Sequence, residues 1–300
     1  MALELRDLPR VGSVGFLRVA LLGNALFSAG CGILMLAMPS TVSEAIGWQG
    51  PHLWFFIGAG LLVFAGALVW QGVQSNPPKA WSLLFSIGDY LWVVGTALSA
   101  MFACSLMDSG GWIFTWGVAS TVALFGTLQL MGIVRLYRQT AVDYALVISV
   151  DVKSNVEQFW PVLSDLGGIK KHTQNLASSE LVGGRDPSLG VRRECASLDG
   201  ARWAETVTAW VPRDGFDVIF NADEPDFPFP FQKMLGGWRL VTRQNQTTVS
   251  VYWIVEPKVQ LSIVFLMPVM ELRMRKDMAS TIKSMDRAAL KKKKQMDEVA

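Results

Sequence analysis

The first half of this 300-residue chain has almost no charged side chains. Between residues 19 and 134 only four charged residues occur, and they are Glu44, Lys79, Asp89 and Asp108. Charged side chains normally cover the surface of a water-soluble protein, so a stretch this long cannot form such a surface. We therefore expect residues 1–140 to form a membrane domain and residues 141–300, where charge is ordinary, to form a water-soluble domain.

Cysteine and histidine are also scarce. The three cysteines, Cys31, Cys104 and Cys195, lie far apart, which argues against a disulfide framework or a zinc site of paired cysteines. With only His52 and His172, the chain lacks the residues for a histidine-rich metal centre. The HExxH and GxxxxGK[ST] motifs are missing as well. We therefore expect no metal and no cofactor.

A strong excess of basic charge is missing too. The formal net charge is only +2 at pH 7. A nucleic-acid partner requires a basic face that neutralises phosphates, so we expect none.

Four long apolar runs fill the first half. Each is close to the ~20 residues that a helix needs to cross ~30 Å of hydrocarbon. The runs are roughly Gly15–Met38, His52–Val73, Ala80–Ala103 and Trp112–Tyr137. Basic residues flank only one side of this arrangement, at positions such as Arg10, Lys79 and Arg138, which predicts that both termini are cytoplasmic. The expected location is the inner (cytoplasmic) membrane, as a multi-pass protein.

Three polar side chains lie well inside these runs. Asn24, Asp89 and Gln129 are each roughly 12–15 Å from the cytoplasmic face at ~1.5 Å per residue, so they can form one polar cluster. An ionisable group at that depth marks a candidate proton or ligand site. The alternative is that the three hold helices together, or that Asp89 pairs with Arg18.

This half loosely resembles small bacterial four-span membrane proteins of uncharacterised function. The resemblance rests on Asn24–Gly32, on Met38-Pro39 with Gly47, and on the Asp89-Tyr90-Leu91-Trp92 stretch. It implies no activity.

The second half has the pattern of an α+β domain. Residues 144–150 alternate as a strand, and Ser154 with Glu157 predicts a capped helix that follows. Six further strand-like segments, separated by turn residues, lead to a helix over about 261–294. The predicted fold is a curved antiparallel sheet around a long C-terminal helix, joined to four transmembrane helices.

The second half resembles the START-like superfamily, also called SRPBCC or polyketide cyclase/dehydrase-like, with its helix-grip fold. The residues that carry the resemblance come in the family's order over about 143–295. They are Val152-x-Ser154-x-Val156-x-x-Phe159-Trp160-x-x-Leu163-x-Asp165, then Gly190-Val191-Arg192-Arg193, Asp199-Gly200, Glu205, Trp253 and Leu290. The resemblance implies a deep apolar cavity between the sheet and the last helix, in which members bind lipids, sterols or polyketides and only some catalyse reactions. One departure is Lys170-Lys171-His172, where relatives often have a tryptophan.

Alternation along the strands indicates which residues share a face. It groups Arg193 with Cys195 on one strand, and Trp203 with Glu205 on the next. Arg193 and Glu205 could pair inside the cavity, or they could form an ordinary solvent-exposed cross-strand pair. The candidate ligand-binding residues are Arg193, Glu205, Trp203, Cys195, Trp160, Trp253 and His172.

Alternating proline and phenylalanine in residues 227–231 predicts an extended, exposed loop. Its rings, Phe227, Phe229 and Phe231, are candidates for a lid over the cavity or for contact with lipid. The alternative is a loop whose rings close the end of the sheet.

Three functions remain open from the sequence. The first is membrane-tethered binding or transfer of a hydrophobic small molecule, such as a lipid, a quinone or a polyketide-like compound. The second is a cyclase, dehydratase or hydrolase that acts on a hydrophobic substrate, with Arg193, Glu205 and His172 as acid–base groups. The sequence shows no nucleophilic triad, so a binding protein is favoured over an enzyme. The third is a small transporter or membrane sensor that uses Asp89, which would require a homo-oligomer because four spans are few for a carrier.

Overall fold

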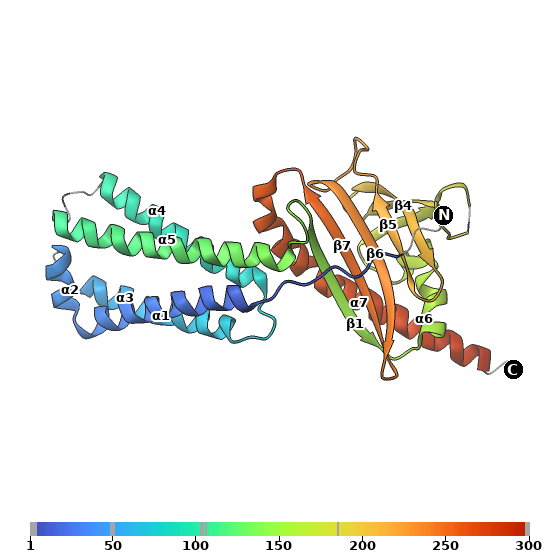
Figure 1. Ribbon diagram of the computed structural model, residues 1–300, viewed down its shortest axis with the longest axis horizontal. Helices are drawn as coiled ribbons and strands as arrows, with labels where there is room; N and C mark the ends of the chain where they lie inside the picture. The colour runs from blue at the N-terminus through green and yellow to red at the C-terminus, as the bar shows by residue number, and fades with distance from the viewer. Residues whose placement is uncertain (1–4, 49–51, 103–104, 106, 185, 298–300) are drawn as a thin grey trace. The chain divides into compact units, whose positions relative to one another are not determined.

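The computed structural model describes residues 5–48, 52–102, 105, 107–184 and 186–297. The chain divides into two compact units (Figure 1). One is Gly12–Leu136, and the other combines Met1–Val11 with Tyr137–Ala300. The predicted division into 1–140 and 141–300 stays a prediction, and the grouping of the N-terminal residues with the second unit is new.

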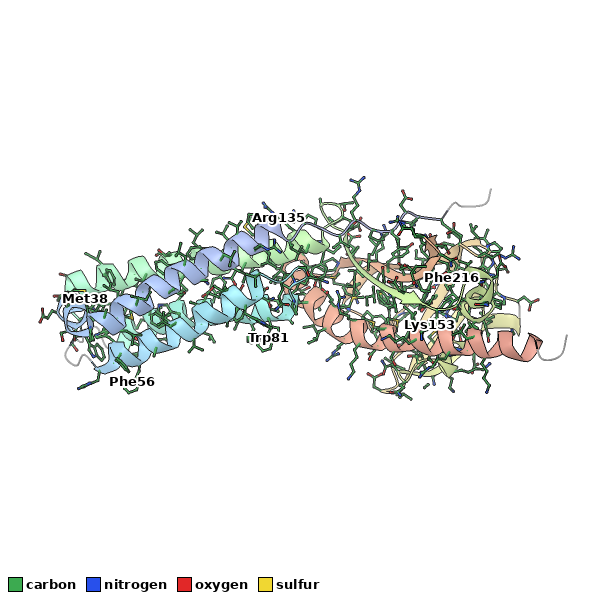
Figure 2. The ribbon with its side chains drawn as sticks, turned by 90° about the horizontal axis from the view of Figure 1, so that it is seen from below. Met38, Phe56, Trp81, Arg135, Lys153 and Phe216 are labelled. Carbon is green, nitrogen blue, oxygen red and sulfur yellow. The ribbon has the colours of Figure 1, made fainter. Side chains whose placement is uncertain are left out.

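The first unit is a bundle of helices. Its elements are α1 (Gly15–Ala37), α2 (Pro39–Ile46), α3 (His52–Gly72), α4 (Lys79–Phe102) and α5 (Ser109–Tyr137), whose last residue belongs to the second unit. Within the described residues, all of these except α2 are long and apolar enough to cross a membrane, as the sequence predicts. Large apolar side chains such as Phe56 and Trp81 stand on the outside of the bundle (Figure 2).

The short helix α2 lies between the first two predicted apolar runs, and the sequence analysis does not predict it. Pro39 stands at its first position, where the missing N–H costs nothing and the fixed φ suits a helix. Gly47 ends it in the left-handed conformation, with φ of 72°. Helical backbone therefore resumes directly after Met38, whose φ of −137° and ψ of 51° end α1.

The second unit contains an antiparallel sheet whose described part has seven strands in the order β1-β7-β6-β5-β4-β3-β2. The strands are β1 (Tyr144–Val152), β2 (Leu176–Leu181), β3 (Arg192–Ser197), β4 (Arg202–Val211), β5 (Gly215–Phe220), β6 (Phe231–Arg243) and β7 (Gln246–Pro257). All seven predicted strands are present. Their alternation sends one set of side chains to the inner face of the sheet and the other set to the outer face.

Helix α7 (Ile263–Asp297) lies across the inner face of the sheet, and α6 (Val156–Leu163) packs against it (Figure 1). This arrangement is a helix-grip fold and confirms the predicted fold class. The start of α6 differs from the prediction. Asn155 caps the helix together with Gln158, in place of Ser154 with Glu157. The Ser154 hydroxyl instead donates to Asp286 Oδ1 of α7 at 2.6 Å, which ties the two helices together.

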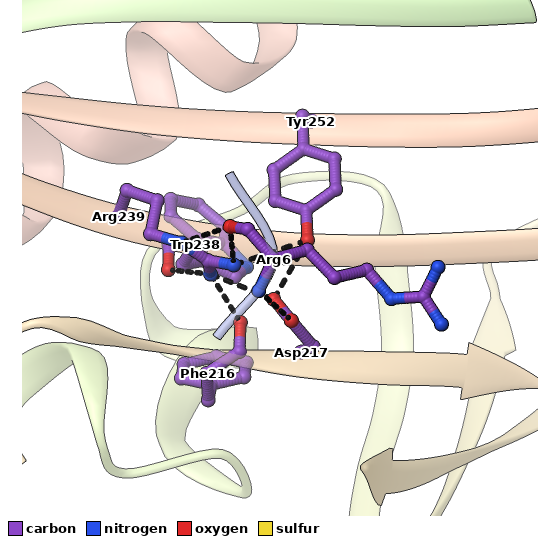
Figure 3. Close-up of polar contacts among 6 residues, drawn as sticks. All are labelled: Arg6, Phe216, Asp217, Trp238, Arg239 and Tyr252. Atoms are coloured by element: carbon purple, nitrogen blue, oxygen red, sulfur yellow. Dashed lines mark hydrogen bonds and ion pairs between the residues drawn. The ribbon is translucent and has the colours of Figure 1, made fainter. Parts of the chain in front are cut away.

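The N-terminal segment lies on the outer face of the same sheet. The Arg6 N–H donates to Asp217 Oδ2 at 3.0 Å, and Arg239 Nε donates to the Arg6 carbonyl at 3.1 Å (Figure 3). Asp217 and Arg239 are themselves a buried ion pair with 2.6 Å between Nη1 and Oδ1, and the Tyr252 hydroxyl also donates to Asp217. We call residues 5–11 the N-terminal arm. Its backbone covers charges that would otherwise face water.

Candidate functional site

A cavity of about 440 Å³ lies between the inner face of the sheet and α7. Strand alternation places Val218, Trp238 and Val251 on its wall, and their neighbours Ile219 and Tyr252 do not line it. The cavity is therefore a direct product of the period-2 pattern of β5, β6 and β7. Its wall is mostly apolar, which suits a hydrophobic molecule.

Three methionines of α7 form the opposite wall of the cavity. Met270, Met274 and Met278 are spaced by four residues, so they share one face of the helix. Methionine is unbranched and polarisable, and a wall built from it can adjust to ligands of different shape. The sequence analysis did not identify these residues, although their spacing was a usable signal.

A buried ion pair lies in this mostly apolar wall. Arg193 on β3 and Glu205 on β4 are direct cross-strand partners, and Arg193 Nη2 donates to Glu205 Oε2. Arg193 Nη1 donates to the Leu166 carbonyl at 3.2 Å, and Trp203 Nε1 donates to Glu205 Oε1 at 2.8 Å. Both charged side chains are at least nine-tenths buried. The pair is therefore inside the cavity and is not the exposed cross-strand pair that the sequence left open.

Burial and neighbouring charge shift the pKa values of Arg193 and Cys195 in this cavity. Burial alone lowers the pKa of Arg193, but the adjacent Glu205 carboxylate outweighs it and raises that pKa above its ordinary value. Burial, and then the charge of Glu205, raise the pKa of the Cys195 thiol to about 12. At pH 7 the cavity thus presents a guanidinium, a neutral thiol and an indole.

Arg193 also retains one unused donor. Its Nε–H is buried and has no hydrogen-bond partner among the described residues. A buried donor without an acceptor costs about 1–3 kcal/mol, so an acceptor supplied by a ligand would recover this energy.

Five of the seven predicted ligand-binding residues line the cavity, and they are Arg193, Cys195, Trp203, Glu205 and Trp253. The other two, Trp160 and His172, do not line it. Trp160 is absent from the described wall because its ring packs edge-on against Trp210, with 5.3 Å between centroids. His172 lies against Ser284, with 3.3 Å between Nδ1 and Oγ, and burial followed by the charge of Lys171 lowers its pKa.

The rings of the aromatic loop are packed, whereas Pro228 and Pro230 between them are exposed. Phe227 and Phe231 are buried, and Phe229 contacts Trp203 and Phe227 with ring centroids 5.5 and 5.3 Å apart. Phe229 and Phe231 line the cavity, whereas Phe227 lines a separate polar groove. The burial of Phe227 and Phe231 differs from an exposed tip, and the lid over the cavity stays a prediction.

The polar residues of the bundle come together as the sequence predicts. Asn24 Nδ2 and Gln129 Nε2 both donate to Asp89 Oδ2, at 2.8 and 3.0 Å, and all three side chains are buried. Arg18 does not pair with Asp89. It donates instead to the carbonyls of Gly72 and Gln74, at 2.9 and 3.1 Å. Cys104 lies outside the described residues.

No group of three His, Cys, Asp or Glu side chains that could hold a metal occurs in the part of the chain that the structure describes.

Residues 145–289 match a family model described as polyketide cyclase / dehydrase and lipid transport. No curated protein matches the chain. Similar solved structures include Ara h 8.0201, with 12% identity and a TM-score of 0.41 over 50% of this chain and 99% of that one. A norcoclaurine synthase point mutant from Thalictrum flavumn has 15% identity and a TM-score of 0.41, over 52% and 99% of the two chains. The di-domain ARO/CYC StfQ from the steffimycin pathway has 8% identity and a TM-score of 0.42, over 62% and 61%.

Proposed function

Because residues 145–289 of this chain are a domain of the polyketide cyclase/dehydrase (SRPBCC/START-like) family, we propose that the cavity binds a hydrophobic small molecule in a membrane-tethered protein. Candidate molecules are a lipid, a quinone or a polyketide-like compound. The four apolar helices would hold the domain beside the bilayer from which such a molecule partitions.

The observation that carries this proposal is the buried Arg193–Glu205 ion pair in a mostly apolar cavity of about 440 Å³. Apolar walls supply affinity for a hydrophobic body, and a few polar groups fix its orientation. The free Nε–H of Arg193 favours a ligand with a carbonyl or another acceptor at one end. Lipids, quinones and polyketides all carry such a group.

The test uses the full chain purified in mild detergent. Organic extraction followed by mass spectrometry should recover a hydrophobic molecule from the wild-type protein. Val218→Trp fills the cavity and should lower the recovered amount, whereas Ile219→Trp places the same ring on the outer face and should not. The proposal is wrong if extraction of the wild-type protein yields no hydrophobic molecule and an added fluorescent fatty acid does not bind to it either.

The alternative is an enzyme of the cyclase, dehydratase or hydrolase type. The convergence of Arg193, Glu205 and Cys195 on one cavity favours it, because acid–base work needs titratable groups that face the substrate. Both Glu205 oxygens already accept hydrogen bonds, from Arg193 and Trp203, so catalysis would first require the ion pair to open. Turnover of an extracted ligand that is lost in Glu205→Gln, with binding retained, would establish the enzyme; unchanged ligand after long incubation would exclude it.

A further inference from the structure

The helical bundle contains a cavity of its own, separate from the one in the second unit. Its volume is about 200 Å³, and α1, α3, α4 and α5 all contribute to its wall. Aromatic side chains such as Phe27 and Phe64 line it, and Asp89 and Trp92 are among its few polar residues. A cavity that contains a buried carboxylate needs a chemical reason, because an unpaired charge at this depth costs several kcal/mol.

The hydrogen bonds around Asp89 run in one direction. The Ser28 hydroxyl donates to Asn24 Oδ1 at 3.2 Å, and the Asn24 and Gln129 amides then donate to Asp89 Oδ2. Because the Asn24 oxygen accepts from a hydroxyl, its amide nitrogen must face the carboxylate. The second oxygen, Asp89 Oδ1, receives no hydrogen bond from the described residues. The network thus fixes the carboxylate and leaves one acceptor for the cavity.

Trp92 is a second polar residue on the wall of this cavity. It follows Asp89 by three residues on α4, so the two side chains lie on one face of the helix, and both line the cavity. The indole N–H of Trp92 is buried and has no partner in the described part of the chain. The two residues thus offer one acceptor and one donor, and a hydroxyl group can donate to the first and accept from the second.

The size and lining of the cavity restrict what carries this hydroxyl. An apolar cavity of about 150 Å³ binds benzene, so one of about 200 Å³ accommodates a single substituted aromatic ring. The rings of Phe27 and Phe64 offer edge and face contacts to such a ring. A bare cation fits less well, because it would find a single free carboxylate oxygen and an indole N–H that repels it.

We propose that the cavity of the helical bundle binds a membrane-soluble phenol, whose hydroxyl donates to Asp89 Oδ1 and accepts from the indole N–H of Trp92. This site is independent of the cavity in the second unit and stands whether or not that cavity binds a ligand. It gives Asp89 a role that helix packing alone would not require.

The test measures binding of 4-fluorophenol to the full chain in lipid nanodiscs by fluorine NMR, with 4-fluoroanisole as the methylated control. The phenol should bind saturably at one site per chain and about tenfold more tightly than the anisole, since methylation removes one hydrogen bond. Gly88→Leu should abolish this binding, because Gly88 lines the cavity and a Cβ there meets no atom within 4 Å. Gly95→Leu is the matched control, two turns along α4 and equally open, and should bind normally.

Two further variants test the polar contacts. Asp89→Asn can keep its oxygen toward the two amides but turns a donor to the cavity, so the tenfold preference for the phenol should disappear. Trp92→Phe keeps an aromatic ring but removes the N–H, so it should weaken the affinity for the phenol by a factor of about ten. Three results would overturn the proposal: no saturable phenol binding, equal effects of Gly88→Leu and Gly95→Leu, or displacement of the phenol by sodium but not by choline, which would indicate a cation site.

Discussion

Removal of either member of the buried Arg193–Glu205 pair should destabilise the C-terminal domain strongly. Arg193→Met leaves the Glu205 carboxylate buried with only the Trp203 N–H, and Glu205→Leu leaves a guanidinium with one carbonyl partner. An uncompensated buried charge costs about 3–5 kcal/mol. For a domain of this size, 1 kcal/mol lowers the midpoint of thermal unfolding by about 2–4 °C, so each single variant should lose about 6–20 °C.

The double variant Arg193→Met/Glu205→Leu separates the value of the pair from the cost of breaking it. It removes both charges and fills the space with apolar groups, so it should unfold much closer to the wild type than either single variant. The double-mutant cycle should therefore give an interaction energy of about 3 kcal/mol or more. The assay is urea unfolding of the full chain in detergent, followed by tryptophan fluorescence. If the two losses simply add, the residues are not coupled and the site as described is wrong.

Three other predictions follow from single contacts. Gly237→Ala should cost about 1–3 kcal/mol of unfolding free energy, because its Cβ would lie 2.5 Å from both Asp217 Oδ1 and Tyr252 Cε1. Gly167→Ala is the control and should cost little, because its Cβ would make only ordinary contacts, 3.6 Å from the Ser179 carbonyl oxygen and 4.0 Å from Asp165 Oδ1. Burial acts to raise the pKa of Asp286, but hydrogen bonds from Ser154 and Lys153 hold that pKa below its ordinary value. The ionised carboxylate therefore stabilises the fold at pH 7, and Asp286→Asn should lower the urea midpoint there. The difference between variant and wild type should vanish as the pH falls through the lowered pKa, because the carboxyl is then protonated. The pKa of the Cys195 thiol is raised to about 12, so the thiol should react with iodoacetamide at pH 8 far more slowly in the folded protein than in the urea-unfolded protein. Peptide mass spectrometry can measure both rates. Equal rates would contradict the buried position.

Residue alternation was enough to predict which residues of the candidate site share one face of the sheet, but not that this face lines the cavity. Arg193 and Glu205 face one another because a period of two puts them on one face, and the Asp199-Gly200 turn sets the register of β3 against β4. The same rule groups Cys195 with Arg193 and Trp203 with Glu205, and the structure places all four on the cavity wall. These are local relations between neighbouring strands, which a sequence encodes directly.

Other features depend on contacts that leave no local pattern. The apolar face of α6 includes Trp160. Periodicity predicts that this face is buried, but it does not predict which neighbour buries it. In the structure Trp160 packs against Trp210. Ser154 has the right type and spacing for a helix cap, yet Asp286, 132 residues away, engages its hydroxyl and Asn155 takes the cap. The N-terminal arm binds through the backbone of Arg6, which any residue other than proline would provide equally.

The N-terminal arm also constrains how the chain can cross a membrane. Arg6 is hydrogen-bonded to Asp217 and Arg239, so both ends of the intervening segment lie in one folded body. A segment whose two ends are joined on one side can pass through a bilayer only an even number of times. Four apolar helices between Arg6 and Tyr144 satisfy this condition, and three or five would require the arm to detach. The parity of the crossings is thus linked to a pair of backbone hydrogen bonds on the outer face of a β-sheet.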